Sequence, residues 1–249
     1  MSTEPISILR NANKAELTAR EALAKMLRAA PIPDDELWQH LPLFINRQCL
    51  TQMLFMNEIY QRIVEMPGII CEFGVRFGRN IALYQNLAGI YEPFNHTRQI
   101  VGFDTFEGFP NVSAKDGNAP AARPGSFAVG KDYELFLDNV LDYHRHENPI
   151  PHILRYEMVK GDAAKTIPYW MEDNPHAIVA LAYFDFDLYE PTRVCLQNII
   201  PRLVKGSVLV FDEFNCKSFP GETLAAMERL NHLQFHKSKF AAHQAYAIW

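Results

Sequence analysis

Acidic residues stand in pairs at the ends of two apolar runs in the second half of the chain. Asp185 and Asp187 follow one run, and Asp212 and Glu213 follow the next. If both runs are neighbouring parallel strands, their carboxyl ends meet at one edge of a sheet and the acids converge. Converging carboxylates raise one another's pKa unless a cation neutralises them. Because no His or Cys stands at either end, the pattern predicts a hard divalent cation rather than zinc.

Such a site would activate a hydroxyl group. Mg²⁺ is the default ion, and Ca²⁺ and Mn²⁺ remain open. A divalent cation beside a substrate hydroxyl lowers the pKa of that hydroxyl and orients it. Asp185 or Asp187 would then remove the proton as general base. The competing interpretation is structural, with the acids capping helices or pairing with Arg193 or Arg202.

A glycine-containing turn follows an earlier apolar run. Glu72 is expected as the last residue of a strand, and Gly74 and Gly78 follow it at a strand-to-helix turn. Glycine allows the backbone to turn tightly and to approach a ligand, and the next helix presents free N–H groups. Buried Glu72 needs a partner, either a ligand amino group or Arg76 or Arg79. The third glycine of the dinucleotide fingerprint is missing, which disfavours an NAD-binding oxidoreductase.

Two more polar positions follow predicted strands. Asp104 ends the second strand, where an acid in a nucleotide-binding sheet accepts hydrogen bonds from both ribose hydroxyls. A turn or a helix N-cap is the alternative for Asp104. Gly161 and Asp162 follow the third strand, where a side chain commonly contacts adenine. For Asp162, an Asx-turn is the alternative.

These residues are positioned by strands that alternate with helices. Strands are predicted at 69–73, 100–103, 157–160, 178–184, 207–211 and 246–249, the last as an edge strand. Helices are predicted at 14–29, 51–65, 80–87, 133–143, 166–171, 192–203 and 223–230. The alternation predicts an α/β fold with a mostly parallel sheet covered by helices on both faces. Ligands bind such sheets at the carboxyl ends of the strands.

The chain divides into an N-terminal helical extension, predicted at 1–66, and a ligand-binding domain at 67–249. Residues 110–150 interrupt the alternation and are predicted to form a lid beside the site. A surface excursion without function is the alternative. His144 and His146 lie in this insertion, and both are read, like His96 and His152, as solvated side chains.

Composition and charge exclude several classes of protein. A net charge of -5 without a basic cluster argues against a nucleic-acid partner. No secretory signal or membrane-spanning run is visible, so we expect a cytoplasmic protein with no membrane partner. The cysteines form no CxxC pair, and we expect them to be reduced.

Four strings resemble the macrocin O-methyltransferase family. They are Gly-Phe-Asp-Thr-Phe-Glu-Gly-Phe-Pro at 102–110, Asp-Phe-Asp-Leu-Tyr-Glu-Pro-Thr at 185–192, Phe-Asp-Glu-Phe at 211–214 and Phe-Pro-Gly-Glu-Thr at 219–223. The resemblance covers roughly residues 69–230. It implies a Rossmann-like class I methyltransferase fold with a seven-stranded sheet, N-terminal helices, a lid and a homo-oligomer. It also implies S-adenosylmethionine (SAM), Mg²⁺ and a sugar hydroxyl on a natural-product or glycan precursor.

The resemblance also assigns residues to roles. The family's metal triad corresponds here to Asp187 (or Asp185), Asp212 and Glu213, and its first member is the general base. This chain has an Asp-Glu pair where the family has Asp-Asp. The expected cofactor-binding residues are Glu72, Gly74, Gly78, Asn80, Asp104, Thr105, Gly161, Asp162 and Asp185.

The leading hypothesis is therefore a metal-dependent O-methyltransferase that acts on a sugar, a glycoside or a similar polyhydroxylated small molecule. A phenolic O-methyltransferase with the same chemistry is an alternative and would need an aromatic-walled acceptor pocket. A non-catalytic SAM-binding protein in a biosynthetic pathway is another, although idle buried acids are costly to a fold.

Overall fold

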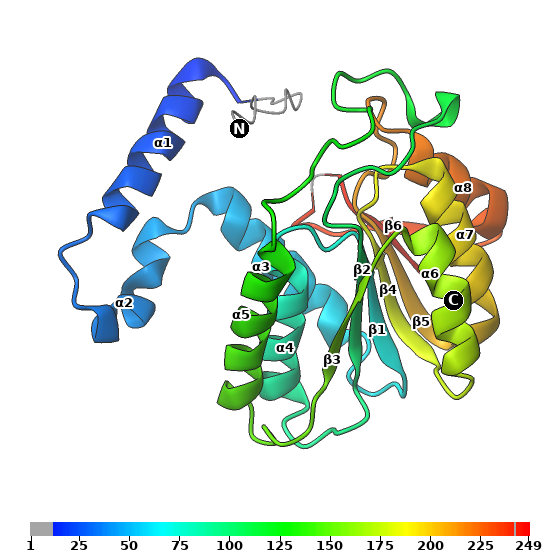
Figure 1. Cartoon of the computed structure of the whole chain (residues 1–249), viewed down its shortest axis with the longest axis horizontal. Helices are drawn as coiled ribbons and strands as arrows, with labels where there is room; N and C mark the ends of the chain where they lie inside the picture. Colours follow the sequence, from blue (N-terminus) through cyan, green and yellow to red (C-terminus); the bar gives the residue numbers. More distant parts are fainter. Residues whose placement is uncertain (1–11, 242) are drawn as a thin grey trace.

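The computed structural model describes residues 12–241 and 243–249, and Figure 1 shows a central sheet between two layers of helices. The strands are β1 (Ile69–Phe73), β2 (Ile100–Asp104), β3 (Tyr156–Lys160), β4 (Val179–Phe184), β5 (Leu203–Phe211), β6 (Phe235–Lys237) and β7 (Ala245–Ile248). The α-helices are α1 (Lys14–Arg28), α2 (Asp34–His40), α3 (Arg47–Gln61), α4 (Arg79–Tyr91), α5 (Tyr133–Glu147), α6 (Ala163–Asp173), α7 (Tyr189–Ile199) and α8 (Gly221–Leu230). Short 3-10 helices are η1 (Leu41–Phe44), η2 (Ala114–Asp116) and η3 (Ile200–Arg202).

The seven-stranded sheet has the order β3-β2-β1-β4-β5-β7-β6. Strands β1 to β5 pair in parallel, and β7 pairs antiparallel with both β5 and β6. The predicted α/β fold with a mostly parallel sheet is confirmed. Strand order reverses between β1 and β4, and ligands of open parallel sheets bind at such a switch point, beyond the carboxyl ends of the strands.

The prediction that the last strand lies at the edge of the sheet is wrong. Strand β7 is flanked on its outer side by β6, in which Phe235 pairs with Ala247. The β6 strand has only three residues, and His236 and Lys237 are two of them. Such a short, polar segment has no apolar periodicity, so the sequence pattern could not reveal it.

Helices cover both faces of the sheet, as predicted. Figure 1 shows α3, α4 and α5 on one face and α6, α7 and α8 on the other. Side chains of neighbouring residues in one strand lie on opposite faces of the sheet. Ile70 packs with the first group of helices, and Cys71 packs with the second. Strand β4 is buried along its whole length, which explains its continuous apolar run.

The N-terminal helices differ in how they contact the sheet. Helices α1 and α2 bury no residue, and Figure 1 shows them beyond α3 and away from the sheet. Helix α3 instead buries Phe55, Met56, Ile59 and Tyr60 in the core. The first eleven residues of the predicted extension lie outside the described part of the chain. No helix among the described residues is both long and apolar enough to cross a membrane.

Most differences between prediction and structure lie at the ends of elements. Helix α3 begins at Arg47 rather than at residue 51, because the Asn46 side chain accepts a hydrogen bond from the Cys49 N–H at 2.9 Å. Helix α7 begins at Tyr189 rather than at residue 192. Strand β1 ends at Phe73, so Glu72 is its penultimate residue.

Candidate active site

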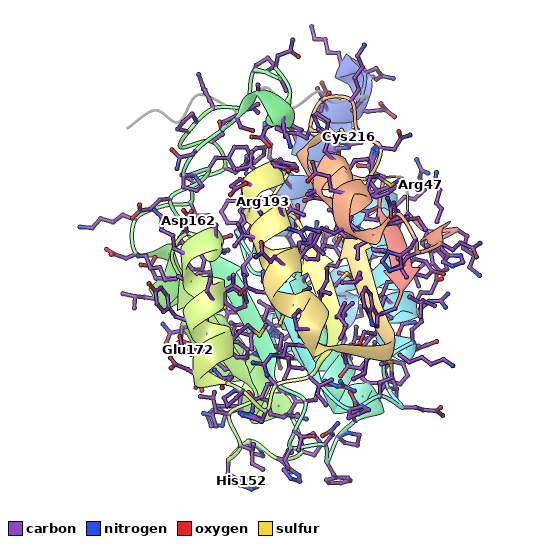
Figure 2. The ribbon with its side chains drawn as sticks, turned by 90° about the vertical axis from the view of Figure 1, so that its right-hand side faces the viewer. Arg47, His152, Asp162, Glu172, Arg193 and Cys216 are labelled. Atoms are coloured by element: carbon purple, nitrogen blue, oxygen red, sulfur yellow. The ribbon has the colours of Figure 1, made fainter. Side chains whose placement is uncertain are left out.

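A cavity of about 520 Å³ lies at the carboxyl ends of the parallel strands. The predicted residues that line it are Glu72, Gly74, Asn80, Asp104, Thr105, Gly161, Asp162, Asp185, Asp187, Asp212 and Glu213. Gly78 is the exception among the predicted set. Figure 2 shows Asp162 at this end of the molecule, where α6 begins, and His152 at the opposite end.

The two glycines of the β1 turn serve different contacts. A Cβ atom on Gly74 would stand 2.1 Å from the Asp185 carbonyl oxygen, and the residue has φ +97°. Glycine therefore allows the β1 turn to touch the end of β4 directly. Gly78 has φ +79° and faces the Leu137 side chain of α5, where a Cβ would come within 2.2 Å. The first glycine shapes the cavity, and the second shapes the helix packing behind it.

Glu72 is buried with part of its hydrogen-bonding capacity unused. The residue is 1% exposed, and Oε2 has no hydrogen-bond partner. Burial raises the pKa of Glu72 well above its ordinary value, while the charge of Arg79 and a hydrogen bond from Asn80 oppose that rise. A free acceptor buried beside a cavity suits a cationic amino group of a ligand. Arg79 attracts Glu72 but leaves Oε2 unpaired, so the ligand interpretation keeps its support.

Asp104 holds the β1 turn in place. Its Oδ2 accepts hydrogen bonds from the N–H groups of Val75 and Arg76, both at 2.7 Å, and its Oδ1 accepts one from Phe106 N–H at 2.6 Å. A carboxylate has about four acceptor positions, so these contacts leave one position, on Oδ1. Both interpretations of Asp104 therefore have a geometric basis, but a ribose could be bound there through one hydroxyl only.

The remaining predicted cofactor residues also make local contacts. The Thr105 hydroxyl donates to the Gly108 carbonyl at 2.7 Å. Asp162 is the N-cap of α6, and its Oδ1 accepts from Ala164 N–H at 3.1 Å. The capping alternative for Asp162 is thus present, while its Oδ2 is left with only a 3.4 Å approach to Lys165.

The acids at the ends of β4 and β5 converge and repel one another. Burial, then Asp212 and Asp187, raise the pKa of Asp185 well above its ordinary value. Burial, then Glu222 and Glu213, do the same for the pKa of Asp187. The pKa of Glu213 is also raised, first by burial. Crowding of this kind is relieved by protonation or by a cation.

The same cluster can be tested as a metal site. Its donors are carboxylate oxygens, which suit a hard divalent cation. Yet no group of three or more His, Cys, Asp or Glu side chains among the described residues is arranged to hold an ion. Asp212 is also engaged, because its Oδ1 accepts hydrogen bonds from Tyr183 and from Gln244. The donor chemistry fits such an ion, whereas the side chains are not gathered around one point.

The structural alternative for these acids has little support. Arg193 pairs with Glu190, and Arg202 donates to backbone carbonyls that include Met171. Neither arginine contacts the acids of the cluster. The N-cap of α7 is Leu188, without a side-chain capping bond, so Asp187 does not cap that helix. The cluster therefore requires a different explanation.

Two buried acids that sequence reasoning gave no role organise the site. Glu222 accepts hydrogen bonds from Phe186 N–H at 2.8 Å and Asp187 N–H at 2.9 Å, and through its other oxygen from Glu213 N–H at 3.1 Å. Asp116, in the insertion, accepts from Tyr189 N–H. An acid at the start of a helix, such as Glu222, is common, and Asp116 lies among the polar residues of the insertion, so neither residue had a distinctive signal.

The insertion contributes Phe127 to an aromatic wall of the cavity. Phe109 and Phe219 pack with Phe127, and all three line the cavity together with Phe77. The guanidinium carbon of Arg76 lies 4.8 Å from the centre of the Phe77 ring and 5.0 Å from that of Phe127. The Nε atom of Arg76 is buried without a hydrogen-bond partner. This wall can contact a flat or anionic part of a ligand.

The histidines of the insertion lie away from the cavity. Nδ1 of His144 is 3.3 Å from the Asn86 amide nitrogen, and His146 approaches Asp142 at 3.4 Å. Neither histidine lines the cavity. The site therefore depends on carboxylates, and neither His144 nor His146 is placed to act as its base.

Comparison with known proteins gives relatives by sequence. No protein-family model matches the chain. The 8-demethyl-8-(2,3-dimethoxy-alpha-L-rhamnosyl)-tetracenomycin-C 4'-O-methyltransferase of Streptomyces olivaceus is 29% identical over 154 residues, 60% of this chain and 54% of the relative. The demethyldecarbamoylnovobiocin O-methyltransferase of Streptomyces niveus is 23% identical over 172 residues, 68% of this chain and 58% of the relative. The chain thus spans little more than half the length of these curated relatives.

Solved structures match over the whole chain. The calicheamicin methyltransferase CalS11 superposes with a TM-score of 0.94 at 40% identity, covering 100% of this chain and 98% of that one. An apo structure of CalS11, described as a TDP-rhamnose 3'-O-methyltransferase, gives a TM-score of 0.85 at 36% identity and covers 99% of both chains. The O-methyltransferase NovP matches with a TM-score of 0.59 at 18% identity over 80% of this chain and 79% of its own, a likeness of fold alone.

Proposed function

Since the chain belongs to the macrocin O-methyltransferase family of class I methyltransferases, we propose that it transfers a methyl group from SAM to a sugar hydroxyl. The methyltransferase fold implies SAM as the cofactor. One observation carries the proposal: a single cavity joins Glu72 at the β1 turn, with its unpaired Oε2, to the acids after β4 and β5. That arrangement provides a site for a cationic cofactor beside carboxylates that can remove a proton.

In this proposal the β1 turn binds the cofactor. Glu72 accepts a hydrogen bond from the amino group of SAM, and Gly74 lets the β1 turn pack directly against the end of β4. Asp104 contacts one ribose hydroxyl through its remaining acceptor position on Oδ1. Asp162 contacts the adenine end of the cofactor. Support comes from the position of each side chain on the cavity wall.

The two acids after β4 take different roles. The charges that act on Asp185 include Arg79 and Glu72, on the cofactor side. Those that act on Asp187 include Arg76 and Glu213, on the aromatic side. We therefore assign Asp187 as the general base. Asp187 takes the hydroxyl proton, the oxygen attacks the methyl carbon, and the carbon–sulfur bond breaks to leave S-adenosylhomocysteine.

A divalent cation, Mg²⁺ by default, is a further part of this proposal. Asp187, Asp212 and Glu213 would have to close around it, and the repulsion of Asp187 by the other two carboxylates supports the idea. When bound, the cation would supply charge that lowers the pKa of the acceptor hydroxyl. The Asp-Glu pair after β5 keeps a carboxylate at both positions.

The acceptor is proposed to be a sugar linked to a nucleoside diphosphate, the class of substrate named for CalS11. Arg76 supports this choice, because a guanidinium held between Phe77 and Phe127 can bind phosphate oxygens. A phenolic acceptor is the second candidate, because five phenylalanines, including Phe109 and Phe219, line the cavity.

The enzyme is also proposed to be a homo-oligomer. Helix α2 exposes 70% of Trp38, and the neighbouring η1 exposes 66% of Leu43. Large apolar side chains gathered on helices that bury nothing within their own chain favour contact with another copy.

Calorimetric titration of SAM, S-adenosylhomocysteine and Mg²⁺ tests the function directly. Wild type is expected to bind both nucleosides, and Asp212→Asn is expected to bind them equally well while losing Mg²⁺. The amide still accepts hydrogen bonds from Tyr183 and Gln244, so the fold is preserved, but it carries no charge for a cation. Wild type that binds neither nucleoside would refute the methyltransferase proposal. Methyl transfer to TDP-rhamnose, with catechol as the phenolic comparison, then identifies the acceptor class.

Arg76→Met is expected to weaken binding of TDP about tenfold or more, the loss that corresponds to a hydrogen bond to a charged group. SAM affinity should change little. Arg76→Lys is the matched control, because it keeps the charge and loses the planar fork, and it should recover only part of the affinity. Calorimetry with TDP alone measures both. Equal TDP affinity in all three proteins would remove Arg76 from acceptor recognition.

A further inference from the structure

Glu222 lies at the first turn of α8, beneath the two loops that carry the acids of the site. Its side chain is fully buried, with 0% of its surface exposed. One carboxylate oxygen accepts hydrogen bonds from Phe186 N–H and Asp187 N–H in the loop after β4. The other accepts from Glu213 N–H in the loop after β5. A single side chain thus joins both loops through their backbones.

We propose that Glu222 is a positioning residue that fixes Asp187 and Glu213 relative to each other. The inference rests on the proposed function for its chemical meaning, but its geometry is independent of the acceptor. Three of the roughly four acceptor positions of the carboxylate are taken by backbone N–H groups. Glu222 is therefore neither the general base nor a free ligand, and it acts on the reaction through the residues that it holds.

The backbone of Asp187 explains why such a residue is needed. Asp187 has φ 62°, in the left-handed region that non-glycine residues seldom adopt. A conformation of this kind persists only where its surroundings impose it. The hydrogen bond from Asp187 N–H to Glu222, at 2.9 Å, is the contact that holds the backbone of Asp187 in this conformation. Without it, the Asp187 carboxylate would lose its fixed direction into the cavity.

The residue before Glu222 allows it to reach the loops. A Cβ atom on Gly221 would stand 2.4 Å from the backbone nitrogen of Tyr189 and 2.7 Å from an Asp116 carboxylate oxygen. Only glycine lets the start of α8 approach the loop after β4 so closely. The helix N-terminus also favours a negative charge in its first turn. The Gly-Glu pair at 221–222 therefore acts as one structural unit.

Glu222→Gln tests the proposal, because glutamine has only one acceptor oxygen and cannot serve both loops. Amide hydrogen exchange at Phe186, Asp187 and Glu213 is the first measurement. We expect exchange to accelerate in at least one loop by about tenfold, the factor that corresponds to losing a hydrogen bond to a charged group. SAM affinity should stay within about twofold of the wild-type value. Mg²⁺ affinity should fall about tenfold or more, because the lost hydrogen bond no longer fixes the acids relative to each other.

Glu228→Gln is the matched control, on the same helix. Glu228 is solvent-exposed and contacts Lys115 and Tyr189 rather than the acid loops. Exchange at the three amides should not change in this variant. Glu222→Asp is the second test variant. Its side chain is one methylene shorter and cannot span both loops, so it should also accelerate exchange.

The outcomes separate this inference from the proposed function. Unchanged exchange in folded Glu222→Gln and Glu222→Asp would overturn the positioning role, whatever either protein binds. Wild type that binds no SAM would instead refute the methyltransferase proposal, and wild type that binds SAM but no Mg²⁺ would refute only the cation. In both of those cases the exchange data still decide whether Glu222 holds the two loops.

Discussion

Gly74→Ala is expected to destabilise the fold by more than about 4 kcal/mol and to abolish SAM binding. The added Cβ would stand 2.1 Å from the Asp185 carbonyl oxygen and 2.7 Å from its carbonyl carbon. Both atoms belong to the backbone, so no side-chain rotation can relieve the clash. The residue also has φ +97°, which alanine adopts only with strain. Because β1 and β4 are paired up to Phe73 and Phe184, the turn cannot move away without breaking the centre of the sheet.

Gly130→Ala is the matched control for this substitution. A Cβ at Gly130 would meet no atom within 4 Å, and its φ lies outside the left-handed region. The free energy of unfolding of Gly130→Ala should differ from that of wild type by less than about 1 kcal/mol. Urea unfolding and SAM titration measure both variants. Gly74→Ala with wild-type stability and affinity would show that the β1 turn does not depend on this close contact.

The sequence placed most residues that line the cavity at one edge of the sheet, because they follow strands whose signals are strong. Apolar runs before Glu72, Asp104, Asp185 and Asp212 were long enough to place the strand ends, and parallel pairing then brought those ends to one edge. The convergence of the acids followed from that topology alone. The sequence does not reveal strand β6, because three residues are too few to show an alternation of apolar and polar side chains.

Side-chain partners could not be predicted in the same way. Asp104 was expected to meet a ligand, yet three backbone N–H groups occupy most of its acceptor positions. Glu222 was visible only as part of a family string, because its partners lie in two other loops. Hydrogen bonds between distant segments depend on the folded geometry, and sequence periodicity contains no information about them. The aromatic wall formed with Phe127 is a further example.

Asp187→Asn is expected to lower kcat for methyl transfer by about a hundredfold to ten thousandfold, the range that general-base catalysis supplies. Asparagine tolerates the left-handed backbone of this position, where φ is 62°. The N–H group that Glu222 binds is also kept, so the fold and SAM affinity should persist. Asp185→Asn is the comparison. If Asp185→Asn alone abolishes turnover while Asp187→Asn is active, the assignment of the base is reversed.

Asp187→Asn is also expected to change how the stability of the fold depends on pH. Burial, then Glu222, raises the pKa of Asp187 in the folded protein above its unfolded value of about 3.9. The folded state therefore binds this proton more tightly than the unfolded state does. The contribution of Asp187 to stability is full below the unfolded pKa and is lost as pH rises through the higher, folded pKa.

Asp187→Asn removes this penalty, because the amide has no proton to lose. Without cations, the variant should therefore gain stability relative to wild type as pH rises from about 4 towards neutrality. Added Mg²⁺ should reduce the difference by stabilising wild type only, because a cation favours the charged carboxylate. Urea midpoints of both proteins across this range, with and without Mg²⁺, measure the effect. A constant difference would mean that ionising Asp187 costs the folded protein nothing, and the crowding of Asp187 would then give no support to the proposed cation.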